Sequence, residues 1–414
     1  MYDLTTYITE LCRAAKSASR SLAVLSAAKK NAALERIARA LEENGAEIIA
    51  ANSVDMSEPG VPPKMLDRLK LDENRIRAIA AAVREVAALP DPVGGGERWV
   101  RPNGLIITRE RVPLGVVAMI YEARPNVTVD AASLCLKTGN ACVLRGGKEA
   151  INTNRVLAGV MRSALAEEDF DPACISLVDD VTREGTALLM RQRGLIDVLI
   201  PRGGAALIKS VVENAAVPVI ETGAGNCHIY IDKYADLDMA VSVAVNAKAS
   251  RPSVCNAVET LLVHAEIAEE FLPLFAAAAA RYNVELRGCE RTRAILPGIN
   301  AASDEDYATE YNDFILAVKV VDSEDEAIEH INKYGTMHSE AIITRDLAAA
   351  ELFRRSVDAA AVYVNASTRF TDGGEFGFGA EIGISTQKLH ARGPMGLAAL
   401  TTTRYLVDGN GQIR

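Results

Sequence analysis

The chain has 414 residues, of which 49% are hydrophobic and 24% are charged, a composition typical of a soluble globular protein with two or three domains. Its formal net charge of −10 argues against nucleic acid or an anionic membrane as the main partner. Its seven cysteines are widely spaced and include no Cys-x-x-Cys pair, which excludes a disulfide framework and a zinc site. Because we find neither a signal-peptide pattern nor an apolar run of membrane-spanning length, we expect a cytoplasmic protein that binds no membrane.

The N-terminal part of the chain predicts a helical scaffold. Residues 3–55 are rich in Ala and Leu, and their apolar side chains recur at helical spacing with charged side chains opposite them. The Pro-rich segment 57–63 interrupts this pattern, and a further helix is expected at residues 73–88 with Asp72 as its cap. These helices carry no residues of evident chemical function, so we interpret them as structural.

A β-hairpin is expected next. Asn103 and Gly104 separate two strand-like runs, which is a strong hairpin signal. An isolated hairpin is only marginally stable in water, so this one needs a partner. The C-terminal run 400–407 also looks like a strand without a local partner. We predict that the hairpin and this run lie together and form the contact between subunits.

Strand and helix then alternate from Leu114 onward. The expected strands are 115–121, 141–145, 175–178, 196–200 and 217–221, and the expected helices are 127–137, 151–166, 183–191 and 205–214. Such alternation predicts an α/β fold with a doubly wound parallel sheet. A second alternating unit is expected after Ile231. Its strands lie near Leu261, Leu316 and Ile342, and its helices are 267–281, 325–333 and 347–356.

Two loops at predicted strand ends combine glycine with positive charge. They consist of Arg145, Gly146, Gly147 and Lys148 after one strand, and of Arg202, Gly203 and Gly204 after another. Ligands of such sheets bind at the carboxyl ends of the strands, and glycines let the backbone approach a phosphate. A bound nucleotide is the economical interpretation, although no Gly-x-Gly-x-x-Gly follows a strand. For a single loop, a simple tight turn would be the better interpretation.

Cys255 is the candidate nucleophile. It lies between a helix-like stretch at 239–249 and a strand-like stretch at 259–264, and junctions commonly present reactive residues. Arg251 lies four residues upstream, and a nearby cation favours the thiolate. The alternative is a buried cysteine that acts as a small hydrophobic residue. The long irregular segment 367–396 is expected to line the substrate site.

Four segments carry a resemblance to a known family. They are VLRGGKEA at 143–150, ETGAGNCH at 221–228, RPSVCNA at 251–257 and KLHARGPMGL at 388–397. With these segments the chain resembles the gamma-glutamyl phosphate reductase family of the aldehyde dehydrogenase superfamily, from about residue 5 to the C-terminus.

The resemblance implies an aldehyde-dehydrogenase-like fold of two doubly wound, Rossmann-like domains and an oligomerisation arm. The NADPH-binding domain would comprise residues 1–97 and 112–230, and the catalytic domain residues 231–392. The hairpin and C-terminal strand, residues 98–111 and 393–414, would form the arm of a homodimer or homotetramer.

The resemblance also implies an activity. The chain would reduce L-glutamyl 5-phosphate to L-glutamate 5-semialdehyde and phosphate with NADPH and without a metal, through a Cys255 thioester, in the second step of proline biosynthesis. Because an acyl phosphate is labile, association with glutamate 5-kinase, which makes it, is a further hypothesis.

Residue roles follow from the matched positions. Cys255 matches the family nucleophile, Asn126 the oxyanion-hole asparagine, and Glu221 the general base of hydrolytic relatives. A base that activates water would hydrolyse the thioester, so a proton relay or a purely structural carboxylate is equally open for Glu221. Glu310 matches the glutamate that holds the nicotinamide ribose.

Further residues are candidates for binding. Arg145 and Lys148 fall where relatives place the basic residue near the adenosine ribose, whereas residues 202–204 depart from the usual turn and leave their cofactor contact open. The candidates for the anionic groups and the amino-acid head of the substrate are Arg124, Arg251, Arg369 and His390. For each one, an ordinary ion pair is the competing interpretation.

Two alternative functions stay open at this level. A hydrolysing NAD(P)-dependent dehydrogenase of another aldehyde is favoured by Glu221, but disfavoured by the Arg-rich loops and by residues 122–126, which lack the superfamily's usual Trp-Asn-Phe segment. A catalytically silent structural or regulatory oligomer is disfavoured by the intact set of Cys255, Asn126 and Glu310.

Overall fold

The computed structural model describes residues 3–58, 66 and 68–414, so most of the predicted Pro-rich break at 57–63 lies outside the described residues. The chain divides into two compact units. Unit 1 comprises Met1–Glu221, Gly377–Gly383 and Met395–Arg414, and unit 2 comprises Thr222–Phe376 and Ile384–Pro394. Among the described helices, none is long and apolar enough to cross a membrane.

Unit 1 is built on a four-stranded parallel sheet with the order β5-β4-β3-β6. Its strands are β3 (Val116–Tyr121), β4 (Ala141–Arg145), β5 (Ile175–Leu177) and β6 (Val198–Arg202). Every side chain of β3 is buried, as expected for a parallel strand that is covered on both faces. The carboxyl ends of β3, β4 and β6 therefore meet at one edge, where the glycine-containing loops begin.

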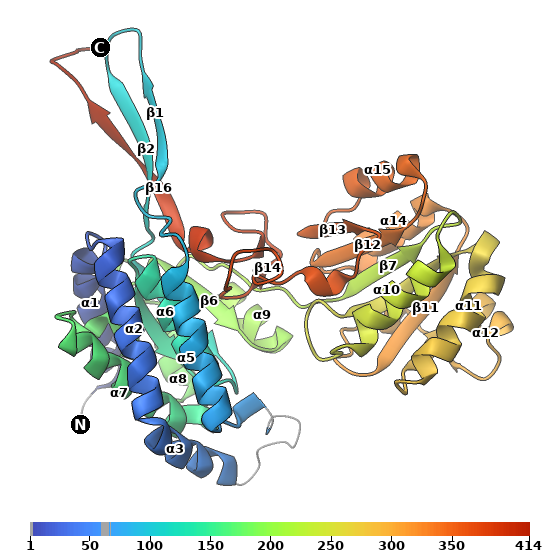
Figure 1. The fold of residues 1–414 in the computed structure, drawn as a ribbon, viewed down its shortest axis with the longest axis horizontal. Coiled ribbons are helices and arrows are strands. Elements are labelled where there is room, and N and C mark those ends of the chain that lie inside the picture. The colour runs from blue at the N-terminus through green and yellow to red at the C-terminus, as the bar shows by residue number, and fades with distance from the viewer. Residues whose placement is uncertain (1–2, 59–65, 67) are drawn as a thin grey trace. The chain divides into compact units, whose positions relative to one another are not determined.

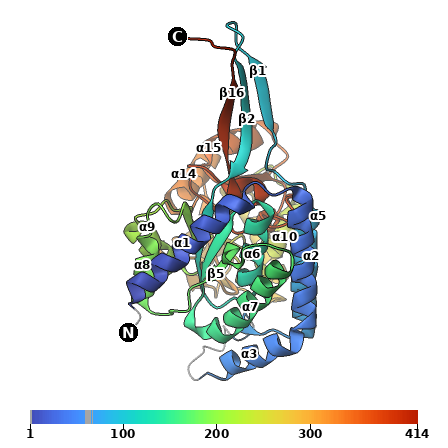
Figure 2. The same ribbon diagram turned by 90° about the vertical axis from the view of Figure 1, so that its left-hand side faces the viewer.

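Helices cover both faces of this sheet (Figure 2). On one face, α1, α8 and α9 share a hydrophobic core with the strands, and α6 and α7 pack on the other face beneath α2, α3 and α5. Their bounds are α1 (Leu4–Leu22), α2 (Ala27–Glu43), α3 (Gly45–Ser57), α5 (Glu73–Ala88), α6 (Asn126–Lys137), α7 (Ile151–Glu167), α8 (Arg183–Met190) and α9 (Ala205–Asn214), with short 3₁₀ turns η1 (Lys148–Ala150), η2 (Pro172–Cys174) and η4 (Leu397–Leu400). The predicted cap is confirmed, since Asp72 Oδ1 accepts the Arg75 N–H at 2.9 Å at the start of α5.

One predicted strand of unit 1 is wrong. Residues 217–221 contain a single isolated bridge, between Leu199 and Val219, and not a strand. Pro218 has no N–H with which to extend the ladder, so the described sheet has four strands and not five.

A three-stranded antiparallel sheet extends away from the helices of unit 1 (Figure 1). Its central strand β2 (Ile106–Pro113) pairs with β1 (Gly96–Val100) on one side and with β16 (Thr401–Asp408) on the other. We call this sheet the arm. The predicted pairing of the hairpin with the C-terminal strand is confirmed, whereas its role in subunit contact stays a prediction.

Unit 2 is built on a seven-stranded parallel sheet with the order β10-β9-β11-β8-β7-β12-β13. Its strands are β7 (Cys227–Ile231), β8 (Val258–His264), β9 (Glu285–Gly288), β10 (Asn300–Ala301), β11 (Ile315–Val321), β12 (Ser339–Ile343) and β13 (Ala361–Val364). A separate two-stranded pair is formed by β14 (Ile384–Ser385) and β15 (Gly393–Pro394). The predicted strands near Leu261, Leu316 and Ile342 are confirmed as β8, β11 and β12.

Helices also cover both faces of the sheet of unit 2. The helices α10 and α11 pack against one face through small and aromatic side chains, and α14 and α15 pack against the other. The helices are α10 (Leu237–Ala249), α11 (Ala265–Ala280), α12 (Glu290–Ile295), α13 (Asp304–Tyr307), α14 (Glu324–Tyr334) and α15 (Leu347–Ser356), and a 3₁₀ turn η3 spans Thr368–Phe370. The predicted doubly wound α/β fold is confirmed in both units.

Candidate active site

Cys255 lies, half-buried, in the turn between α10 and β8 of unit 2. Its backbone is tightly held: a Cβ added to Gly225 would lie 1.5 Å from the carbonyl oxygen of Cys255, so a side chain does not fit there. The thiol of Cys227 donates to the same oxygen at 3.2 Å. The orientation of the peptide at Cys255 is therefore fixed by neighbours on two sides.

Arg369 spans the turn that carries Cys255. Its Nη1 donates to Asn256 Oδ1, and its Nε donates to Ser250 Oγ at 3.1 Å. Burial lowers the pKa of Arg369, the charge of Arg251 lowers it further, and the thiolate form of Cys255 opposes both effects. The structure thus brings Arg369 into the electrostatic surroundings of Cys255, and Arg251 into those of Arg369.

The start of the irregular segment 367–396 is tied to the same turn. The side-chain amide of Asn256 donates to the carbonyl oxygens of Arg369 at 3.2 Å and Thr371 at 2.9 Å. In return, Thr368 Oγ1 donates to the Asn256 carbonyl at 2.7 Å. These bonds hold η3 against the residue that directly follows Cys255.

Glu310 is connected to Cys255 through a glycine. Its Oε1 accepts the Gly225 N–H at 2.8 Å, and Gly225 is the residue that packs on the Cys255 carbonyl. The sequence did not lead us to predict a role for Gly225. The feature that could have indicated it is the Gly-Ala-Gly run at 223–225, shortly before β7.

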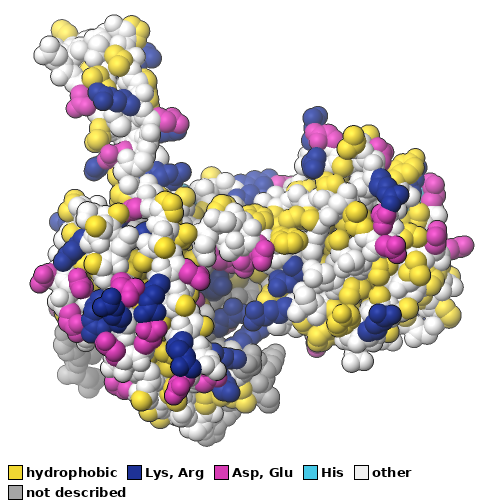
Figure 3. All heavy atoms as spheres, in the orientation of Figure 1, with side chains coloured by type: hydrophobic (Ala, Val, Ile, Leu, Met, Phe, Trp, Pro, Cys, Tyr) yellow, Lys and Arg dark blue, Asp and Glu magenta, His cyan; other side chains and the backbone are white. Residues whose placement is uncertain are grey.

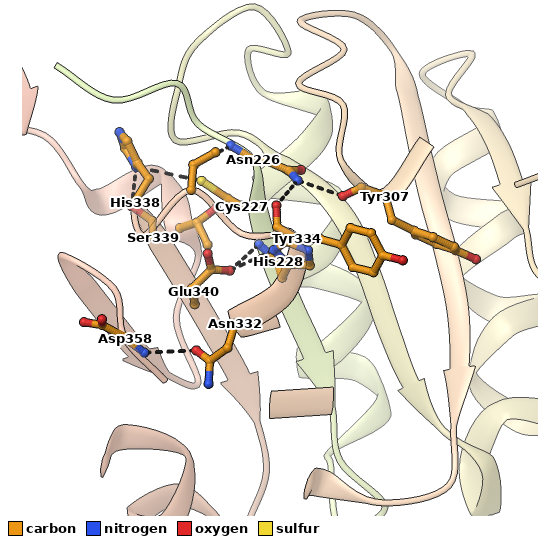
Figure 4. Close-up of polar contacts among 12 residues, drawn as sticks. Asn226, Cys227, His228, Tyr307, Asn332, Tyr334, His338, Ser339, Glu340 and Asp358 are labelled. Carbon is orange, nitrogen blue, oxygen red and sulfur yellow. Dashed lines mark hydrogen bonds and ion pairs between the residues drawn. The ribbon is translucent and has the colours of Figure 1, made fainter. Parts of the chain in front are cut away.

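Behind Cys227 lies a buried polar cluster (Figure 4). His338 Nδ1 lies 3.8 Å from Cys227 Sγ and 2.8 Å from Ser339 Oγ. Nearby, Glu340 Oε2 accepts the backbone N–H of His228 at 2.6 Å. Burial lowers the pKa of His338 to about 4, so this imidazole is neutral at pH 7.

Asn126, the predicted oxyanion donor, is the first residue of α6 in unit 1. Its Nδ2 donates to Asp130 Oδ2 at 2.9 Å, one turn further along the helix. Burial raises the pKa of Asp130 to about 6, and the bond from Asn126 and the charge of Arg202 oppose this shift. Shortly before the helix, Ala123 has a left-handed backbone with φ of 33°, and its N–H donates to Glu149 Oε1 at 2.8 Å.

The loop after β4 presents positive charge at the sheet edge of unit 1. Arg145 Nη2 donates to the Thr182 carbonyl at 3.1 Å, whereas its Nε is buried with no hydrogen-bond partner among the described residues. Burial lowers the pKa of Arg145. Lys148 in η1 is exposed. These two cations, with an unused donor on one of them, suit an anionic nucleotide cofactor.

The glycines of this loop are required by the space around them. A Cβ on Gly146 would lie 2.2 Å from Asn154 Nδ2, and one on Gly147 would lie 2.2 Å from Glu149 Oε1. Side chains at these positions would displace the polar groups beneath the loop. Only glycine therefore fits at these two positions of the loop after β4.

The loop after β6 is arranged differently. The Gly204 N–H donates to Glu122 Oε2 at 2.9 Å, and a Cβ on Gly203 would lie 2.6 Å from the same oxygen. Arg202 Nη1 donates to the Ile382 carbonyl at 2.9 Å. The Glu122 carboxylate already accepts the Gly204 N–H that a phosphate would need, so this loop suits an anion less well than the loop after β4.

The other three predicted site residues lie in loops. Glu221 is the last residue of the first segment of unit 1 and is half-buried, as is Arg124 after β3. His390 is exposed in unit 2, with a left-handed φ of 68°. Its neighbours Lys388 and Arg392 both pair with Asp358, at 2.5 Å and 2.7 Å.

Comparisons with known proteins agree on the family. A sequence profile described as the aldehyde dehydrogenase family matches residues 5–313 and 307–386. The gamma-glutamyl phosphate reductase of Moorella thermoacetica is 60% identical over 404 residues, which cover 97% of each chain. That of Carboxydothermus hydrogenoformans is 58% identical over 413 residues, covering 98% of this chain and 99% of the relative.

A solved structure supports the same assignment. The crystal structure of gamma-glutamyl phosphate reductase from Thermotoga maritima has a TM-score of 0.97 and 48% sequence identity, and the match covers 98% of this chain and 99% of that one. The chain therefore belongs to the aldehyde dehydrogenase family and, within it, to the gamma-glutamyl phosphate reductases.

Proposed function

We propose that this chain catalyses the NADPH-dependent reduction of L-glutamyl 5-phosphate to L-glutamate 5-semialdehyde with release of phosphate, the second step of proline biosynthesis from glutamate. The observation that carries the proposal is the turn at Cys255, which Arg369 holds by hydrogen bonds and near which Arg251 also lies. A thiolate near Arg369, which itself lies near Arg251, is suited to an acyl phosphate, because this substrate brings a reactive carbonyl and negative charge together. The relatives with this name are similar along nearly the whole chain.

In the first step, the Cys255 thiolate attacks the acyl carbon, the carbon–oxygen bond to phosphate breaks, and a thioester forms as phosphate leaves. Negative charge develops on the carbonyl oxygen during this attack. We assign the backbone N–H of Cys255 as a donor to that oxygen, contributing about 3 kcal/mol. Asn126 is proposed as a further donor only from its match to the family's oxyanion-hole asparagine. The contacts of Gly225 and Cys227 on the Cys255 carbonyl hold the peptide that supplies the first donor.

NADPH supplies, when bound, the hydride that converts the thioester to the aldehyde. Arg145 and Lys148 would hold its adenosine end, and Glu310 would hold the nicotinamide ribose. The Nε of Arg145, which has no hydrogen-bond partner among the described residues, fits this cofactor. The Arg202–Gly204 loop contributes less, because Glu122 takes the Gly204 N–H.

The alternative, a hydrolysing dehydrogenase of another aldehyde, needs a base that activates water. Glu221 is the candidate base. The named relatives are reductases of an acyl phosphate, which does not favour hydrolysis. In the proposed reaction Glu221 relays a proton or holds local structure.

The test follows the reverse reaction, with L-glutamate 5-semialdehyde and NADP, in the presence and absence of phosphate. We expect NADPH to form only with phosphate, and Cys255→Ala to abolish its formation because no thioester can form. NADPH formation without phosphate would show hydrolysis and contradict the proposal.

We also propose that the arm joins subunits into a dimer or tetramer in the cytoplasm, and that the enzyme associates with glutamate 5-kinase, since its substrate is labile. The kinase association is tested by sedimentation of the two proteins separately and mixed. An unchanged boundary at micromolar concentration would contradict it.

A further inference from the structure

A buried ion pair brackets the turn that carries Cys255. Lys248 Nζ lies 2.5 Å from Glu259 Oε2, and the two side chains are only 1% and 0% exposed. Lys248 lies in the last turn of α10 and Glu259 near the start of β8, so their contact closes the base of the turn. The proposed chemistry uses neither charge. Because burying both charges costs about as much as their attraction returns, stability alone gives little reason for the pair.

Glu259 makes a second contact with its other carboxylate oxygen. Glu259 Oε1 accepts the backbone N–H of Asn312 at 3.3 Å. Asn312 has a left-handed backbone with φ of 55°, and its side-chain amide donates to the Glu310 carbonyl at 3.5 Å. One carboxylate therefore holds both the base of the Cys255 turn and the loop that carries Glu310.

The contacts then close into a ring within unit 2. Glu310 Oε1 accepts the Gly225 N–H at 2.8 Å, and Gly225 packs directly on the Cys255 carbonyl. From Cys255, one route reaches Glu310 through Gly225, and the other follows the chain to Glu259, which pairs with Lys248, and then passes through Asn312. The only charged pair in this ring lies on the second route.

We propose, on the basis of the function proposed above, that Lys248 and Glu259 form a positioning pair that sets the Cys255 sulfur at a defined place relative to the Glu310 carboxylate. Neither residue touches a reacting atom. Their effect is geometric, because Cys255 would carry the acyl group and Glu310 would hold the ribose of the cofactor. A displacement of about 1 Å between reacting groups lowers a rate by about a hundredfold.

The double variant Lys248→Met/Glu259→Gln removes both charges at nearly constant volume. The glutamine keeps an oxygen for the Asn312 N–H, and a neutral buried pair is tolerated at least as well as an ionic one. We expect kcat to fall by at least about tenfold. The primary deuterium isotope effect on kcat should increase, because hydride transfer from a misplaced donor becomes more rate-limiting.

Two measurements separate positioning from other effects. NADPH affinity, followed by ligand fluorescence without substrate, should fall about fivefold as the contact of Glu310 weakens. Alkylation of Cys255 by iodoacetamide, followed by mass spectrometry of its peptide, should keep its rate and pH profile, because the thiol itself is unaltered.

Lys319 and Glu326 provide a matched control. They form a partly exposed ion pair in the same unit, 2.9 Å apart, between β11 and α14. Lys319→Met/Glu326→Gln should keep kcat, the isotope effect and the NADPH affinity of the wild type. A further variant, Lys248→Arg, keeps the charge but changes its geometry, and should lower kcat even if the double variant does not fold.

Several results would overturn the role of the pair. One such result is a wild-type kcat in both Lys248 variants. Another is a loss of kcat that is fully explained by the loss of folded protein measured by circular dichroism. A shifted pH profile of alkylation would show that Lys248 acts on the thiol and not on geometry. A wild-type enzyme without phosphate-dependent activity would contradict the proposed function. In that case the NADPH affinity still tests the positioning pair, because an unchanged affinity in the double variant would contradict its role.

Discussion

Gly225 shows how one position without a side chain organises the catalytic turn. Its N–H donates to Glu310, and the place of a Cβ coincides with the Cys255 carbonyl. We therefore expect Gly225→Ala to lower both stability and kcat, the latter by at least about a hundredfold, since the turn must move by an ångström or more. Steady-state kinetics and thermal unfolding measure the two effects.

Gly159 offers the matched control for this substitution. It lies exposed within α7, and a Cβ there would meet no atom of the described residues within 4 Å. Gly159→Ala should raise the free energy of unfolding by about 0.5–1 kcal/mol, because alanine loses less backbone entropy in a helix. A Gly225→Ala enzyme with wild-type kcat would contradict the tight placement of the turn.

His338 makes stability depend on pH. Burial lowers its pKa to about 4, whereas an unfolded histidine titrates near about 6.5. Between these values the unfolded chain binds a proton that the folded chain does not, so the free energy of unfolding falls as the pH is lowered. At about pH 5 this loss amounts to about 2 kcal/mol relative to about pH 7.

His338→Gln removes this titration. The melting temperature of the variant should therefore drop less between about pH 7 and about pH 5 than that of the wild type. Equal drops in the two proteins would show that His338 can take up its proton in the folded state.

At the scale of elements, α7 begins on a cap supplied from another helix. Asp55 of α3 accepts the backbone N–H of Asn152 at 3.2 Å and of Thr153 at 2.8 Å, and it also accepts from both side chains. Asp55 is 1% exposed. Asp55→Ala should lower the free energy of unfolding by about 3 kcal/mol, because it leaves buried donors without an acceptor. Urea denaturation measures this loss.

Ser323 provides the comparison, as an ordinary local cap. Its Oγ accepts the Glu326 N–H at 3.1 Å at the start of α14. Ser323→Ala should cost about 1 kcal/mol. If Asp55→Ala cost no more than this, the bonds from α3 to α7 would contribute no more than a single surface cap.

At the scale of the whole molecule, the arm is the part that we expect to contact another subunit. Within the described residues, β1 and β16 each pair on one side only, and such edges favour association with another chain. Large apolar side chains are exposed along it, among charged ones (Figure 3). Val407 is 57% exposed, and Trp99 packs edge-on against Tyr405 with ring centroids 6.2 Å apart.

We expect Val407→Lys to lower the sedimentation coefficient, because a charge on the strand opposes burial against another subunit. Val54→Lys is the control, since Val54 is 50% exposed on α3, at the other end of unit 1 from the arm (Figure 1). Val54→Lys should sediment like the wild type. An unchanged boundary for Val407→Lys would contradict the role of the arm in assembly.

Much of the fold could be predicted from local patterns. Helix caps such as Asp72, the turn at Asn103 and Gly104, and the position of Cys255 between a helix and a strand all depend on residues close in the chain. Periodicity and turn chemistry act over a few residues, so the sequence alone predicts these features without any knowledge of tertiary contacts. The predicted strand at 217–221 failed for a related reason: its composition suits a strand, but its neighbours provide only one bridge.

The contacts that build the candidate site join residues that are far apart in the sequence. The cap from Asp55 to Thr153 joins residues 98 positions apart, and the bond from Gly225 to Glu310 joins residues 85 positions apart. No local pattern records which distant backbone N–H a carboxylate will meet. Residue types near Cys255 could therefore be named from the sequence, whereas the ring through Gly225, Glu259 and Glu310 exists only because the folded chain brings these segments within hydrogen-bonding distance.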